Sequence, residues 1–368
     1  MKNFVAVGVI VAIAGQALAQ VNGDVVFTSQ QANGIKVISG SVPGPATTLY
    51  SSPNPATLFA GITAAPDGNY YVADGRFPFP NLTDAGVVRI SNLFGVASAS
   101  QLYAGTPVQN PLGLVWDNNT GQLITNSNPG SPPNPPTTDG VYGVSLSGSL
   151  TTFFTEPNPI PAGRPTFHAS HSIIKDPRPG SNDFLVSCVN GGTAINPSPT
   201  FGFDAESSTV WRLRWTGATY AMDTSPVVDL ASSFTGFGQS FYNSRGMAAV
   251  PGSSSFYITD HEAGKINRVD MDVLGNFTGM TTILSGLSFP ENVIYNPYTN
   301  KLVFGERASS LADYGAMTGS KISTVNLDGT GLTVLSTGDH ARGFYIVPAP
   351  GAAALLGIGG LLATRRRR

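Results

Sequence analysis

The stretch AGITAAPDGNYYVAD, residues 60–74, joins two short apolar runs through a Pro-Asp-Gly turn and ends on an aspartate. Short runs joined by a tight glycine-containing turn are typical of antiparallel β-hairpins. The same plan returns at residues 112–126, 171–190, 245–260 and 291–306. Successive copies start roughly 45 to 75 residues apart, which is close to the repeat length of propeller blades with added loops.

The two ends of this repeat region complete each other. Residues 342–347 have the pattern of a first strand with no second strand after it, whereas residues 24–28 and 34–38 match a second and a third strand with no first strand before them. Joining the ends completes a sixth blade and leaves no open sheet edge. The sequence therefore predicts an all-β, six-bladed β-propeller closed by its N- and C-terminal strands. A seven-bladed ring or a pair of β-sandwiches is the alternative.

One position of the repeat predicts a site. The residue before the Gly, Ser or Asn of each first strand should lie at one mouth of the central channel. In blade order these residues are Ala60, Leu112, His171, Arg245, Glu291 and Arg342. The polar members His171, Arg245, Glu291 and Arg342 are the candidate ligand-binding residues, suited to an anionic or hydroxyl-rich ligand. Alignment alone favours the alternative that Glu291 pairs with its flanking arginines and only neutralises their charge.

A second ring follows the second strands: Asp74, Asn126, Asn190, Asp260 and Glu306. Short polar side chains at strand ends commonly accept hydrogen bonds from turn backbones, and we expect this structural role. The rhythm of glycine with apolar residues, a turn, YVAD and then Gly-x-apolar-x-Arg resembles the NHL and gluconolactonase-like propellers. That resemblance implies a central divalent ion held by Glu, Asn and Asp. Glu291, Asn126 and Asp260 have suitable chemistry but no matching motif, so we expect no cofactor and leave Ca²⁺ open.

Signals occupy both ends of the chain. Residues 1–19 have a charged start, an apolar core and an Ala-Leu-Ala box, and we expect a signal peptide cleaved after Ala19. The last stretch, VPAPGAAALLGIGGLLATRRRR, begins with Val347, Pro348, Ala349 and Pro350 and ends with Arg365, Arg366, Arg367 and Arg368. It resembles the PEP-CTERM sorting signal of exosortase substrates, with Ala349 in place of the usual glutamate. We therefore divide the chain into a signal peptide at 1–19, a propeller at 20–348, and a short transmembrane sorting helix with an arginine tail at 349–368.

Composition and charge limit the classes of partner that the chain can have. The chain has 22 acidic and 20 basic residues, but Lys2 and the four terminal arginines belong to the signals, so the propeller region is acidic. An acidic body with no basic patch argues against nucleic acid as a partner. Cys188 is the one cysteine and lies in an apolar run, so we expect a buried thiol and no internal disulfide.

These features predict an exported protein of the bacterial envelope or extracellular matrix, at the surface or outside the cell and not an enzyme. Its expected partners are signal peptidase, an exosortase, and extracellular polysaccharide or envelope proteins. The C-terminal segment would hold it to the membrane before processing. The alternative is a divalent-metal-dependent propeller hydrolase or lactonase.

Overall fold

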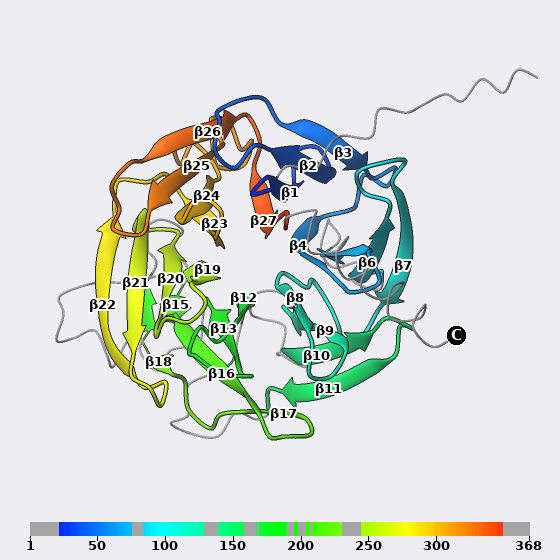
Figure 1. Ribbon diagram of the computed structural model, residues 1–368, viewed down its shortest axis with the longest axis vertical. Coiled ribbons are helices and arrows are strands. Elements are labelled where there is room, and N and C mark those ends of the chain that lie inside the picture. Colours follow the sequence, from blue (N-terminus) through cyan, green and yellow to red (C-terminus); the bar gives the residue numbers. More distant parts are fainter. Residues whose placement is uncertain are drawn as a thin grey trace, which may run out of the picture.

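The computed structural model is a ring of six antiparallel sheets around a central axis, which confirms the predicted fold class (Figure 1). It describes residues 22–75, 84–128, 139–157, 167, 169–189, 195–197, 204–206, 208–229 and 244–348. The predicted signal peptide, residues 349–368, His168 and Asn190 lie outside them. Within the described residues there is no α-helix, and hence none long and apolar enough to cross a membrane.

Three blades follow the predicted repeat in the first half of the chain. Their strands are β4 (Phe59–Ala64), β5 (Tyr70–Asp74), β6 (Gly86–Ser91) and β7 (Ser98–Ala104); β8 (Leu114–Asp117), β9 (Gln122–Ser127), β10 (Gly140–Ser145) and β11 (Leu150–Thr155); and β12 (Ser170–Lys175), β13 (Phe184–Cys188), β16 (Thr209–Trp215) and β17 (Tyr220–Met222). A short β18 (Val228–Asp229) also pairs with β16. A separate hairpin of β14 (Ile195–Pro197) and β15 (Asp204–Glu206) lies outside the repeat, and the sequence pattern did not predict it.

Two further blades consist of β19 (Ser244–Ala249), β20 (Ser255–Asp260), β21 (Lys265–Met271) and β22 (Phe277–Leu284), then β23 (Pro290–Asn296), β24 (Lys301–Glu306), β25 (Lys321–Asn326) and β26 (Thr333–Thr337). The closing blade has the order β27 (Ala341–Ile346), β1 (Val25–Ser29), β2 (Gly34–Ile38) and β3 (Thr47–Ser51). Its first strand comes from the C-terminal end and its second and third from the N-terminal end, as predicted, and β3 adds a fourth. This pairing closes the ring.

The first strands form the inner wall and contact one another in the order β4, β8, β12, β19, β23, β27 and back to β4. Small residues allow this approach. A Cβ at Gly343 would collide with the carbonyl oxygen of Ala60, and one at Gly246 would lie 2.5 Å from the Cα of Asn292. Glycine is therefore required at these two junctions between neighbouring inner strands.

The core lies between successive blades, where apolar side chains of facing sheets interlock. One such cluster joins Tyr257 and Ile266 of one blade to Val293, Leu302 and Phe304 of the next. Cys188 is fully buried on β13, as the sequence predicted. Because each sheet is covered on both faces by its neighbours, the ring holds the six inner strands in fixed positions.

Candidate functional site

The predicted site residues meet where the inner strands begin, on a side of the ring that we call the mouth face. His171, Arg245, Glu291 and Arg342 are each the second residue of their strand, on β12, β19, β23 and β27. The charges of Arg245, Glu291 and Arg342 all act on the imidazole of His171. Ala60 and Leu112, at the corresponding positions, are buried in an apolar cluster. The polar part of the mouth therefore comes from four neighbouring blades.

Glu291 is the centre of this group and is 2% exposed. Its Oε1 accepts hydrogen bonds from Nη1 of Arg245 at 2.6 Å and from Nη1 of Arg307 at 3.1 Å. Its Oε2 lies 2.6 Å from Nε2 of His340. The expectation that Glu291 pairs with its neighbours is thus correct for Arg245. It is wrong for Arg342, because Arg307 and His340 take that place.

The protonation states follow from burial and charge. Burial alone raises the pKa of Glu291, but His340, Arg245 and Arg307 outweigh it and hold this pKa well below its usual range. Burial lowers the pKa of His340, although Glu291 acts in the opposite direction. At neutral pH the carboxylate is therefore charged, and a neutral His340 donates its Nε2 hydrogen to Glu291.

Tyr314 adds an aromatic side to the mouth. It belongs to the segment between β24 and β25, and its hydroxyl lies 3.4 Å from Nη2 of Arg245 and 3.0 Å from Nε2 of His261. The guanidinium carbon of Arg307 lies 4.2 Å from the centre of its ring, a cation–π contact. Burial and the charge of Arg245 hold the pKa of His261 well below its usual value.

Arg342 and His171 differ from these residues. In the described part of the chain neither side chain has a hydrogen-bond partner, although the charge of Glu291 acts to raise the pKa of both. Burial lowers the pKa of Arg342, and the nearby Arg307 and Arg245 lower it further, against the effect of Glu291. A cavity of about 250 Å³ follows the axis, and residues of all six inner strands line it, among them His171 and Asn292 near the mouth and Lys175 at the other end of β12. Arg342 does not line this cavity itself, but its chain neighbour Gly343 does.

Several charged side chains meet at the mouth. Among the described residues, Arg245, Arg307 and Arg342 face Glu291, and Glu262 acts on Arg245 as a second carboxylate. Arg245 and Arg307 form ion pairs with Glu291, and no ion pair among the described residues includes Arg342. Guanidinium groups bind carboxylates in bidentate geometry, so the mouth is suited to a carboxylate or a hydroxyl-rich ligand.

The repeat alignment did not place Arg307, His340, Tyr314 or His261 at the mouth. Two of them carried a usable signal, because His261 and Arg307 directly follow the second-ring acids Asp260 and Glu306. The same repeat alignment, moved by one residue, would have found both. His340 and Tyr314 lie outside the repeat pattern and had no such signal.

The second ring has the structural role that we expected. The side chain of Asp74 accepts a hydrogen bond from the backbone N–H of Leu58 at 3.1 Å, and that of Asn126 accepts one from Gly113 at 2.7 Å. Asp260 accepts one from Ala263 at 3.0 Å, and Glu306 one from Ser288 at 2.7 Å.

The residues considered for Ca²⁺ all use oxygens in these contacts or, for Glu291, in pairing with Arg245, Arg307 and His340. The described ranges contain no group of three or more His, Cys, Asp or Glu side chains placed to hold a metal ion.

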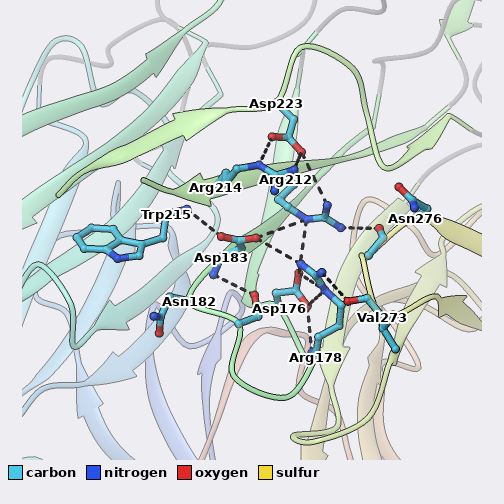
Figure 2. Close-up of polar contacts among 12 residues, drawn as sticks. Asp176, Arg178, Asn182, Asp183, Arg212, Arg214, Trp215, Asp223, Val273 and Asn276 are labelled. Carbon is cyan, nitrogen blue, oxygen red and sulfur yellow. Dashed lines mark hydrogen bonds and ion pairs between the residues drawn. The ribbon is translucent and has the colours of Figure 1, made fainter. Parts of the chain in front are cut away.

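A larger cavity, of about 610 Å³, lies at the side of the ring between the third blade and the β21–β22 turn. Its charges are balanced, as Figure 2 shows: Arg178, Arg212 and Arg214 pair with Asp176, Asp183 and Asp223. Each of these guanidinium groups is already paired with a carboxylate. This groove therefore has fewer unpaired groups for a ligand than the mouth has.

The fold and the mouth define a closed six-bladed β-propeller with a charged axial site. No model of a protein family and no curated protein matches the chain. Among solved structures the chain is similar to one in the crystal structure of a nidogen/laminin complex, with a TM-score of 0.57 and 11% identity over 87% of this chain and 97% of that one. It is also similar to a putative 6-phosphogluconolactonase from Bacteroides uniformis ATCC 8492, with a TM-score of 0.51 and 16% identity over 89% and 87% of the two chains. At these identities the likeness shows the fold alone.

Proposed function

We propose that this chain is an exported, membrane-held binding protein whose mouth face binds an acidic glycan. The observation that supports the proposal is the guanidinium of Arg342, which has no hydrogen-bond partner in the described residues and whose chain neighbour Gly343 lines the axial cavity. A sugar carboxylate would pair with this guanidinium, and its hydroxyl groups would find His171 and Asn292 close by.

Titration calorimetry with tri-galacturonate as the probe tests this site. We expect Arg342→Ala to weaken binding by about 10- to 100-fold, because a charge-assisted hydrogen bond contributes about 1.5–3 kcal/mol. The matched control is Arg268→Ala, which removes an exposed arginine paired with Asp270 on the body of the ring. Equal binding by wild type and Arg342→Ala, or equal binding of the methyl-esterified trisaccharide, would contradict the site.

Export rests on the two terminal signals. We infer that signal peptidase removes residues 1–19, that the apolar segment holds the protein in the membrane, and that an exosortase reads the tail and cuts near Pro350. Mass spectrometry of the protein from its native cells checks both cuts. We expect a mature N-terminus at Gln20 and a surface form without Arg365 to Arg368. A surface form that keeps Met1 or the arginine tail would refute the processing.

No structural observation favours the alternative of a metal-dependent hydrolase. A glycan-binding, envelope-associated role remains our proposal.

A further inference from the structure

The side of the ring opposite the mouth, which we call the exit face, is where the inner strands end. In every blade the strands alternate in direction, so the turns between first and second strands and between third and fourth strands all lie there. The chain also leaves the ring on this face, since β27 ends and β1 begins there. The backbone of Val347 is bonded to Gly23 at 3.1 Å and to Asp24 at 2.9 Å, so the last described residues are fixed to the ring.

Exposed apolar side chains gather on this face. Of the eight large apolar side chains exposed in the described residues, six lie in its turns. Four blades contribute third-to-fourth-strand turns, with Val42 (62% exposed), Val96 (85%), Val273 (85%), Leu274 (70%) and Leu332 (49%). Tyr298, in the β23–β24 turn, is the sixth. Single exposed apolar residues are ordinary on a protein surface, so the observation that matters is that six of these eight lie on one face.

The apolar tips lie on one arc of the ring, and this arc includes the blade from which the chain ends leave. They lie beside the outer strands β22, β26, β3 and β7, which succeed one another around the ring in Figure 1. The closing blade, from which both ends of the chain leave, belongs to this arc. The corresponding turns of the other two blades, between β10 and β11 and between β16 and β17, have the sequences LSGS and TGAT at residues 146–149 and 216–219. The apolar arc is therefore one-sided and includes the blade with the termini.

One of the two most exposed tips, at Val273, is held rigidly. Nη1 of Arg178 donates to the carbonyl oxygen of Val273 at 3.3 Å, and Nη2 of Arg212 donates to that of Gly275 at 2.5 Å (Figure 2). Asn276 donates to the carboxylate of Asp272 and closes the turn from the other side. Val273 and Leu274 thus point outward from a fixed turn.

The sequence that follows Val347 indicates what the exit face would contact. After Val347 come Pro348 and the predicted sorting segment 349–368, in which Ala349 and Pro350 precede the run of small and apolar residues that begins at Gly351. Three extended residues span at most about 11 Å. If the apolar segment lies in a bilayer, the fixed exit face lies within the headgroup layer.

We propose that the exit face rests on the membrane surface, with the arc of Val42, Val96, Val273, Leu274 and Leu332 in the interfacial layer. This rests on the proposed membrane anchoring, and it turns the mouth face away from the bilayer toward its ligand. The nearby turns carry acidic residues such as Asp67, Asp117, Asp272 and Asp328, so the contact is apolar and needs no anionic lipid.

Fluorescence quenching on the full chain in phosphatidylcholine vesicles tests the orientation. Val96→Cys and Val273→Cys each receive an environment-sensitive dye, and Leu311→Cys, an exposed apolar position on the mouth face (51% exposed), is the matched control. Wild type checks background labelling, since Cys188 is buried. We expect nitroxide lipids to cause roughly a twofold loss of emission at Val96 and Val273 and none at Leu311. Ser147→Cys, on the exit face outside the arc, should be quenched less.

The outcomes separate the two claims. Co-flotation with vesicles but no quenching at Val96 and Val273 would overturn the orientation and leave the anchor intact. Failure to float would overturn both the anchor and the orientation, whereas ligand binding at the mouth is measured independently. Dyes at Val96 and Val273 that are shielded in detergent without lipid would show a second copy on this face and would also overturn the proposal.

Discussion

At the residue scale, the mouth depends on one buried carboxylate with several donors. Glu291 lies where alignment predicted a charged ring, and its bonds to Arg245, Arg307 and His340 neutralise it in place. A buried charge is stable only when it is paired and hydrogen-bonded. The bonds of Glu291 therefore stabilise the folded structure. The guanidinium of Arg342, which takes no part in them, is the group available to a ligand.

The buried histidines predict a pH dependence of stability. Burial depresses the pKa of His171, His261 and His340, so all three are neutral in the folded state. Unfolded histidine titrates near pH 6.5, so the unfolded chain binds more protons below this pH and stability falls there. We expect a loss of up to about 1.4 kcal/mol per pH unit for each histidine below about pH 6.5.

Urea unfolding at pH 7.5 and pH 5.5 measures this slope. His340→Gln keeps a donor for Glu291 and removes one titrating group, so its slope should be smaller than that of wild type. The same unfolding free energy at both pH values would show that these histidines are accessible to protons in the folded state.

The sequence could predict the site only in part at this scale. His171, Arg245, Glu291 and Arg342 occupy one position of the repeat, and a repeat places equivalent residues at equivalent points of a ring. His340 and Tyr314 come from connecting segments, where no period relates sequence to position. Which arginine pairs with Glu291 depends on side-chain geometry, and the repeat says nothing about it.

At the element scale, the inner strands determine how closely the blades approach one another. Turn residues such as Asp67-Gly68 made the hairpins predictable because glycine readily adopts the positive φ of 79° found at Gly68. The β14–β15 hairpin was not predictable, since it inserts between β13 and β16 without a copy in other blades. A repeat pattern predicts only the strands that all blades share, so it does not predict a hairpin inserted in one blade.

Gly343→Ala should destabilise the closure of the ring. Its new Cβ would collide with the carbonyl oxygen of Ala60, where β27 meets β4, and a backbone collision can only be relieved by moving a strand. We expect a loss of about 1–3 kcal/mol in the free energy of unfolding. Gly279→Ala on β22 is the control, because its Cβ would meet nothing within 4 Å. Equal stability of the two variants would mean that the inner strands are not closely packed at this junction.

At the scale of the whole molecule, the two faces of the ring have different chemistry. The mouth face carries the charged cluster, the exit face carries the apolar tips and both ends of the described ring, and the axial cavity runs along the inner strands between the two faces. Closure by β27 and β1 was predictable from unmatched strands at the two termini. The division between the faces was not, because turn side chains receive their direction only from the assembled blades.

The central claim is that Arg342 binds a sugar carboxylate at the axial mouth. A crystal structure of the complex with tri-galacturonate tests it most directly. We predict density for a carboxylate within hydrogen-bonding distance of the Arg342 guanidinium, with the sugar ring over the cavity beside His171 and Asn292. An empty mouth at saturating trisaccharide, or sugar bound elsewhere on the ring, would contradict this account.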